Sequence, residues 1–216
     1  MFQPDEHRLD DPAAIAEAAR AIQFACIVTS TESALQATHA PCVVKERDDD
    51  IAVEFHVARA NPHWKQATEG PSLAIFQGEQ AYIHPGWYPT KAETGKAVPT
   101  WNYVTLHLHG MLEIMRPGEE LHRHLEELTA LNEAHRNEPW AISDAPDRYI
   151  ETMKRGLVGL RLRVSEAHGA LKLSQNKNDA DHAGVLAGLN ASGGAAGVMA
   201  AQMAEIRRRQ DTGENQ

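Results

Sequence analysis

VTLHLHGMLEI, residues 104–114, is the most informative segment of the sequence. Apolar side chains occupy nearly every second position, and His107, His109 and Glu113 stand between them. A period of two places alternate side chains on opposite faces of a β-strand, one of which can be buried. The pattern therefore predicts a long strand whose apolar face packs against a hydrophobic core.

Other β-rich runs lie on both sides of this strand. Before it they cover residues 24–30, 35–45, 51–57 and 72–77, and after it residues 160–164 and 168–173. Polar turns separate these runs, and the last two are close enough to form a hairpin across Gly169 or the preceding turn. Short strands joined by turns indicate a mainly antiparallel sheet.

Helical patterns flank the strands. Asp11 and Pro12 match an N-cap followed by the first helical position, and Asn61-Pro62 repeats this signature before a short helix. An amphipathic helix is predicted within 117–135, and another from Pro146 to Arg155. Residues 84–100 contain three prolines and two glycines, which predicts a long loop.

Composition limits the class of protein. The chain has 216 residues and a formal charge of −9, from 21 Lys and Arg against 30 Asp and Glu. We expect one domain over residues 1–190 and a helical or disordered tail over 191–216. The acidic balance disfavours nucleic-acid binding through phosphate neutralisation. No apolar run approaches the roughly 18 residues of a membrane span, and the polar N-terminus does not match a signal peptide, so a cytoplasmic protein is expected.

Three groups of residues are candidates for chemistry, and the first is a metal motif. His107, His109 and Glu113 satisfy H-x-H-x3-E, the first half of the metal motif of cupin barrels, and alternation places them on one strand face. The glycine and the later histidine motif of cupins are absent. A metal site and a polar sheet face that binds nothing both fit this pattern.

The second group, FHVARANPHWK at 55–65, combines cationic and polar side chains with the start of a short helix. Backbone N–H groups at a helix start, together with Arg or Lys, form charge-assisted hydrogen bonds to a phosphate. His56, Arg59, Asn61 and Lys65 therefore predict an anion site, with a solvated surface loop as the alternative.

The third group joins the aromatic loop to KLSQNK at 172–177. Trp87, Tyr88 and Trp101 supply apolar walls, and each segment adds lysine and small polar side chains. A flat heteroaromatic ligand needs this mixture of walls and a few convergent donors. Ordinary packing of the aromatic side chains would give the same pattern.

Several longer strings, taken in order, resemble one protein family. They are HVARANPHW (56–64), IFQG (75–78), AYIHPGWYPTK (81–91), GKAVPTWNY (95–103), HLHG (107–110) and KLSQNK (172–177), followed by Asp-x-x-Gly-Val-x-x-Gly-Leu (181–189). Together they resemble the FMN-binding negative transcriptional regulators, the PaiB-like proteins. The resemblance runs from about residue 1 to residue 189, so only the tail lies outside it.

This resemblance implies a mainly antiparallel α+β fold, a split β-barrel with flanking helices, as in flavin reductases and pyridoxamine-phosphate oxidases. It also implies a homodimer with FMN at the subunit interface and its phosphate near His56, Arg59, Asn61 and Lys65. Further lining residues would be Lys96, Thr100, Trp101, Asn102, Ser174, Gln175 and Asn176. A flavin-dependent oxidoreductase activity is one expectation, but no catalytic residue is assigned, because the flavin carries the redox chemistry itself.

Two other functions stay open. One is a DNA-binding repressor with a vestigial flavin site, although the sequence shows no helix-turn-helix pattern and its basic run, Arg207-Arg208-Arg209, lies in the tail. Direct DNA binding is therefore not expected. The other is a metal-dependent barrel enzyme that uses His107, His109 and Glu113.

Overall fold

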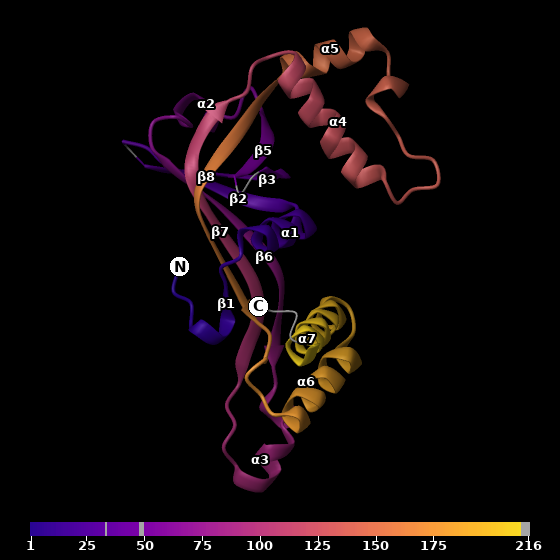
Figure 1. Cartoon of the computed structure of the whole chain (residues 1–216). Coiled ribbons are helices and arrows are strands. Elements are labelled where there is room, and N and C mark those ends of the chain that lie inside the picture. Colours follow the sequence, from indigo (N-terminus) through magenta and orange to yellow (C-terminus); the bar gives the residue numbers. More distant parts are fainter. Residues whose placement is uncertain (33, 48–49, 213–216) are drawn as a thin grey trace. The chain divides into compact units, whose positions relative to one another are not determined.

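The computed structural model describes residues 1–32, 34–47 and 50–212. The chain forms two compact units, each built from several segments of the sequence. Unit 1 comprises Met1–Leu9, Gln77–Thr105 and Gly169–Gln216, and unit 2 comprises Asp10–Phe76 and Leu106–His168. The three longest strands contribute residues to both units, so each unit is described separately below (Figure 1).

An eight-stranded sheet is the main element of the described chain. Its strands are β1 (Arg8–Leu9), β2 (Phe24–Ser30), β3 (Leu35–Pro41), β4 (Val43–Arg47), β5 (Asp50–Ala58), β6 (Pro71–Ile83), β7 (Thr100–Ile114) and β8 (Leu157–Lys172). The strand order is β3-β2-β6-β7-β8-β5-β4, and β1 pairs with β8. This path is open, and the strand pairs given by their register, such as Ala25 with Ala40 and Phe55 with Leu160, are antiparallel. The predicted class, α+β with a mainly antiparallel sheet and flanking helices, is confirmed.

The long strand predicted at 104–114 is confirmed, and it forms most of β7. Val104, Leu106, Leu108, Gly110 and Leu112 are buried, and the residues between them are half-buried or exposed. Ile114 departs from the pattern and is 46% exposed, because the strand ends there. The alternation therefore fixes which face of β7 meets the core, and it places His107 and His109 on the other face.

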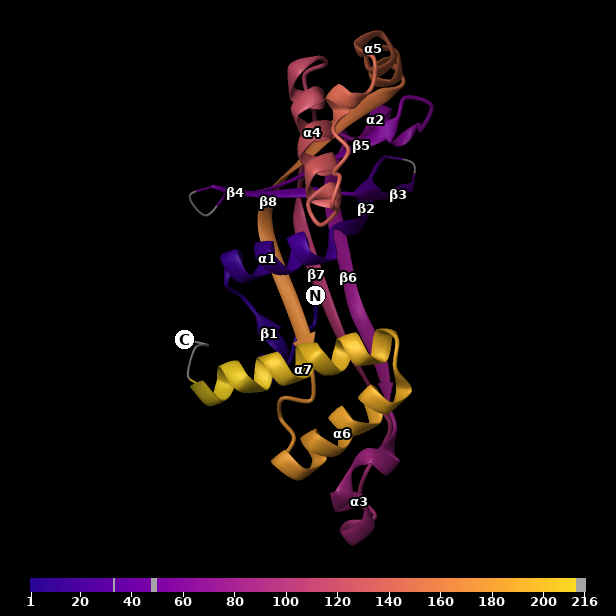
Figure 2. The same ribbon diagram turned by 90° about the vertical axis from the view of Figure 1, so that its right-hand side faces the viewer.

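The helices of unit 2 follow the predicted signals. They are α1 (Pro12–Ile22), α2 (His63–Gln66), α4 (Glu119–Glu133) and α5 (Asp147–Arg155), with a 3-10 turn at Ile142–Asp144. The Asp11 side chain accepts hydrogen bonds from the backbone N–H groups of Ala13 and Ala14, as expected of an N-cap. Ile15, Ala16 and Ala19 on α1 are buried, and α1 contacts β4 (Figure 2).

The described helices of unit 1 comprise one short α-helix, a longer pair of α-helices and two 3-10 turns. They are α3 (Pro89–Thr94), α6 (Asp179–Ser192) and α7 (Ala195–Thr212), with 3-10 turns at Asp5–His7 and Pro85–Trp87. Gly184 and Gly188 let α6 lie directly against Trp87, since a Cβ at either position would collide with that residue. Met199, Ala200 and Met203 on α7 are buried, and α7 packs on α6 (Figure 1). The tail is helical as far as Thr212, while the predicted domain boundary at residue 190 stays a prediction.

Three predictions of secondary structure are wrong. Residues 84–100 are not one loop, because Pro85 and Pro89 begin short helices and Gly95 ends α3 in the left-handed conformation. Residues 160–172 lie in one strand, β8, instead of a hairpin, and Gly169 pairs with Leu9 of β1 in the ladder. The run 35–45 divides into β3 and β4, because the backbone N–H of Cys42, between them, donates its hydrogen bond to the carbonyl of Gln23.

None of the described helices is long and apolar enough to cross a membrane.

Candidate functional site

Unit 1 contains a cavity of about 530 Å³. Its walls come from the N-terminal segment, the region around α3, the first residues of β7 and the segment from the end of β8 to the start of α6. The lining side chains most relevant to binding are Tyr88, Lys96, Thr100, Tyr103, Lys172 and Lys177. Small-molecule sites in proteins commonly occupy about 300–1,000 Å³. The cavity is therefore large enough for a mononucleotide-sized ligand.

Three lysines give this cavity a positive lining in a chain whose net charge is −9. The Lys172 ammonium donates a hydrogen bond to the Thr100 hydroxyl (2.6 Å) and lies 5.9 Å from the centre of the Tyr103 ring. Lys177 lies 5.3 Å from the centre of the Tyr88 ring. Lys96 is exposed. An ammonium carries three donors, so Lys172 and Lys177 keep the capacity to bind an anion.

Two carboxylates also line the cavity, but other groups of unit 1 already satisfy them. Asp181 is 7% exposed and accepts hydrogen bonds from the Thr90 backbone N–H, the Thr90 hydroxyl and the Asn178 amide. Burial raises the pKa of the Tyr88 phenol, and the charge of Asp181 raises it further. Glu6 accepts a hydrogen bond from the Asn176 amide (2.9 Å). The groups left available in the cavity are therefore mainly cations and hydroxyls.

Asn102 and Ser174 form a buried, hydrogen-bonded pair in the wall of the cavity. Asn102 is fully buried and exchanges two hydrogen bonds with the Ser174 hydroxyl, at 3.0 and 3.1 Å. Ser174 has a φ of +59°, a left-handed conformation that a non-glycine residue adopts only when its surroundings hold it there. The Gln175 side chain binds the backbone that precedes it, accepting from the N–H of Leu173 and donating to the carbonyl of Leu171. These polar groups hold the chain that carries Lys172 and Lys177.

The second predicted group lies in unit 2, and most of its polar atoms are engaged there. The Arg59 guanidinium donates to the backbone carbonyls of Arg155 (2.8 Å) and Leu157 (3.1 Å). The Asn61 oxygen accepts from the N–H of His63, and its amide donates to Thr38. A smaller cavity of about 230 Å³ adjoins Arg59. The predicted anion site thus retains few donors of its own.

His56 and Lys65 complete this second group. His56 shares a hydrogen bond with His124 between their ring nitrogens (3.1 Å), and burial lowers the pKa of His56. Lys65 is exposed and lies 6.0 Å from the centre of the Trp64 ring. Of the two, Lys65 is the side chain with its charge available to a ligand.

The eleven predicted cofactor residues therefore fall into separate groups. Five line the cavity of unit 1, namely Lys96, Thr100, Asn102, Ser174 and Asn176. Trp101 is 52% exposed and packs edge-on against Tyr82, with ring centres 5.9 Å apart. Lys172 and Lys177, which begin and end the KLSQNK string of the third predicted group, also line the cavity, although neither was named individually as a cofactor residue.

Glu113, the carboxylate of the predicted metal motif, is held by arginines. One oxygen accepts a hydrogen bond from Arg161 (2.8 Å) and the other from Arg163 (2.9 Å). Burial raises the pKa of Glu113, but the hydrogen bonds and charges of Arg163 and Arg161 outweigh this and keep the pKa below its usual value. Both oxygens have partners, which disfavours Glu113 as a ligand beside His107 and His109.

A family model described as "Putative FMN-binding domain" matches residues 1–166. The chain belongs to this FMN-binding family. The protease synthase and sporulation protein PAI 2 of Bacillus subtilis is 35% identical over 168 residues, covering 76% of each chain. An uncharacterised protein of Aspergillus fumigatus is 28% identical over 216 residues, covering 80% of this chain and 83% of its own length.

Solved structures share the fold of this FMN-binding family member. The FAD and haem binding protein of Mycobacterium smegmatis superposes with a TM-score of 0.56 at 13% identity, covering 77% of this chain and 73% of its own. The flavocytochrome Anf3 of Azotobacter vinelandii gives a TM-score of 0.51 at 14% identity, covering 82% of this chain and 74% of its own. These likenesses confirm the predicted fold, a split barrel with flanking helices.

FMN is the cofactor of the family, and the cavity of unit 1 fits it. A phosphomonoester carries about −1.5 to −2 charges at neutral pH, and the lysines Lys96, Lys172 and Lys177 provide the matching cations. Tyr88 and Tyr103 provide aromatic faces for a planar ring system.

Proposed function

We propose that this member of the FMN-binding family holds FMN in the cavity of unit 1. The convergence of Lys96, Lys172 and Lys177 on a cavity of about 530 Å³ carries the proposal. Lys172 and Lys177 bind the phosphate, and the faces of Tyr88 and Tyr103 shield the ring system from water. Thr100 positions Lys172 through the hydrogen bond that its hydroxyl accepts.

The reaction class that follows is a flavin-dependent oxidoreductase. Bound FMN supplies the transfer of hydride or single electrons, while the protein provides placement and electrostatics. The support of Asn102 and Ser174 keeps the lysine-bearing segment in place. No side chain is assigned as acid, base or nucleophile.

Regulation by direct DNA binding is disfavoured by the arrangement of the basic run in α7. Arg207 donates to the backbone carbonyls of Gln175 and Lys177 and pairs with Asp179. Arg208 and Arg209 both pair with Glu205. These contacts lie within unit 1, so the run does not form a free cationic face. A salt-dependent gel shift of DNA by the purified protein would support the repressor alternative.

The experiment for the FMN site is a fluorescence titration with three variants. Each charge-assisted hydrogen bond contributes about 1.5–3 kcal/mol, so the double variant Lys172→Ala, Lys177→Ala should lose at least about tenfold in FMN affinity. Lys91→Ala is the matched control, since this exposed lysine on α3 is not part of the cavity lining. Unchanged affinity in the double variant would reject the proposed site.

The third variant tests the second predicted group. Arg59→Ala, Lys65→Ala removes the two cations of the anion site predicted in unit 2, and we expect FMN affinity within about twofold of wild type. A loss of tenfold or more here, with normal binding by the Lys172, Lys177 variant, would move the phosphate to unit 2.

We also propose that the protein is a cytoplasmic homodimer, as the family resemblance implies. Light scattering of the purified chain, with and without FMN, measures the mass directly. A mass of one chain, 23.8 kDa, in the presence of saturating FMN would contradict the homodimer.

A further inference from the structure

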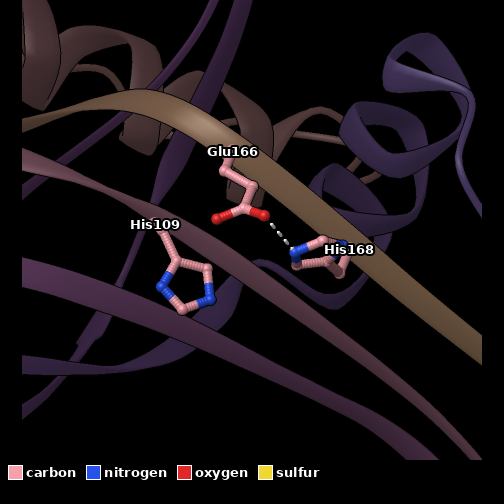
Figure 3. Close-up of side chains that lie close together, drawn as sticks. All are labelled: His109, Glu166 and His168. Atoms are coloured by element: carbon pink, nitrogen blue, oxygen red, sulfur yellow. Dashed lines mark hydrogen bonds and ion pairs between the residues drawn. The ribbon is translucent and has the colours of Figure 1, made fainter. Parts of the chain in front are cut away.

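Outside the FMN cavity, unit 2 brings together two imidazoles and a carboxylate that have no role in the proposed FMN site. His109 comes from β7, and Glu166 and His168 come from the neighbouring strand β8 (Figure 3). One donor atom from each side chain lies within 4.8 Å of the other two. Residues 166 and 168 share a face of their strand because side chains alternate.

The backbone explains how the two strands bring these groups together. Gly110, next to His109, lies directly against the carbonyl of Arg163, where a Cβ would collide with the neighbouring backbone. The Ser165 hydroxyl donates to the carbonyl of His109 (3.4 Å). His109 is thereby held opposite the part of β8 that carries Glu166 and His168, and the rings of His109 and His168 lie 5.9 Å apart.

We propose that His109, Glu166 and His168 form a site for a divalent transition-metal ion, with Zn²⁺ as the best-matched example. Two imidazole nitrogens and one carboxylate oxygen form a donor set that zinc accepts, and three protein ligands leave a position open for water or substrate. Ligand bonds of about 2.0–2.2 Å in a tetrahedral site require donor atoms roughly 3.3–3.6 Å apart. Two of the three side chains, Glu166 and His168, already lie at 2.8 Å, between a ring nitrogen and a carboxylate oxygen.

The proposed site has room for the remaining adjustment. Glu166 is exposed, while His109 and His168 are half-buried, so small rotations can bring the donors to a shared ion without disturbing the core. This set shares only His109 with the sequence motif, because His168 takes the place of His107. Glu166 replaces Glu113, whose two oxygens are bound to Arg161 and Arg163.

The test is calorimetric titration of the full chain, freed of metal by chelation and free of any histidine tag, with Zn²⁺. We expect one tight site in the wild-type protein. His109→Ala and His168→Ala should each weaken zinc binding by more than about tenfold, since even partners outside the ligand shell cost 10–100-fold. Co²⁺ gives a second measure, because its visible absorption reports the ligand geometry.

Three controls make the outcome decisive. His122→Ala removes another histidine, one that pairs with Glu126 on α4, and should leave the tight site unchanged. Glu113→Gln separates the two candidate carboxylates, because it should leave zinc affinity unchanged while Glu166→Gln weakens it. Thermal unfolding in chelator confirms that each variant is folded. Absence of a tight site, or equal affinity in wild type, His109→Ala and His168→Ala, would overturn the proposal whether or not FMN binds.

Discussion

The polar side chains buried in unit 2 and those around the cavity of unit 1 are partnered in different ways. In unit 2, Glu54 is 1% exposed and lies between Lys45 (3.0 Å) and Arg161 (2.8 Å). In unit 1, Lys172 and Lys177 contact a hydroxyl and aromatic faces and have no carboxylate partner among the interactions described for them. Charges that the protein neutralises itself serve stability, whereas charges that it leaves available serve binding.

The electrostatics of Glu54 support this interpretation of unit 2. Burial raises the pKa of Glu54, but the hydrogen bonds and charges of Lys45 and Arg161 outweigh burial and hold the pKa below its ordinary value. The carboxylate is therefore ionised at neutral pH, and removing a partner would leave an uncompensated buried charge.

The largest effect is expected from breaking this ion-pair network. Arg161→Ala should lower the free energy of unfolding by about 3–5 kcal/mol, the range for breaking a buried pair. Urea denaturation at pH 7 measures it. Arg163→Ala is the matched control, because its side chain is 67% exposed although it binds the same Glu113, and it should cost no more than about 1 kcal/mol. Equal losses in the free energy of unfolding of the two variants would show that burial does not determine how much these ion pairs contribute to stability.

The next effect is a pH dependence from His124, a buried histidine that shares a hydrogen bond with half-buried His56. Burial is the main cause that lowers the pKa of His124 to about 4. The charges of His56, Lys45 and Arg161 act in the same direction, and the charge of Glu54 opposes them. The folded-state pKa is thus below the ordinary value of about 6.5, and the unfolded chain binds more protons between these two values. Stability should be fully present above pH 6.5 and should fall as the pH decreases towards 4, by at most ~3 kcal/mol.

Urea denaturation at several pH values between 7 and 4 checks this prediction. Carboxylates also titrate in this range, so the informative quantity is the difference between wild type and His124→Leu, which cannot take up the proton. The wild-type curve should be the steeper one. Parallel curves would mean that His124 contributes no pH dependence to stability.

A smaller effect concerns the packing of α6 in unit 1. Gly184→Ala places a methyl group against the carbonyl of Trp87, and overpacking of this kind costs about 1–3 kcal/mol. Gly197→Ala on α7 is the control, since nothing lies within 4 Å of its added Cβ, and alanine there should stabilise the helix by about 0.5–1 kcal/mol. Thermal unfolding distinguishes the two variants. A shift of the unfolding temperature in the same direction in both would contradict the packing argument.

Local patterns explain most of what could be predicted from the sequence. The alternation in β7 and the N-cap at Asp11 each depend on neighbouring residues, so both were predicted correctly. The continuity of β8 could not be predicted, because Gly169 pairs in the ladder with Leu9, a residue far away in the sequence.

The site was predictable only in part for the same reason. Lys96 and Thr100 were found from the family strings, and they line the cavity. Arg59 matched an anion site by residue type, yet its guanidinium binds the carbonyls of Arg155 and Leu157, almost a hundred residues further along the chain. Sequence indicates which side chains carry charge, but only the fold shows which charges are already neutralised or bound.

The smallest effect tests whether position in the cavity matters as well as charge. Lys96 lines the cavity but is exposed, so solvent and salt screen its attraction to an anion. Lys96→Ala should therefore weaken FMN binding by no more than about fivefold, compared with at least about tenfold for the Lys172, Lys177 double variant. Titration at low and high salt checks the cause, because the contribution of Lys96 should fade as salt increases, whereas that of the half-buried lysines should persist. A loss at Lys96 as large as in the double variant would place the phosphate at the mouth of the cavity.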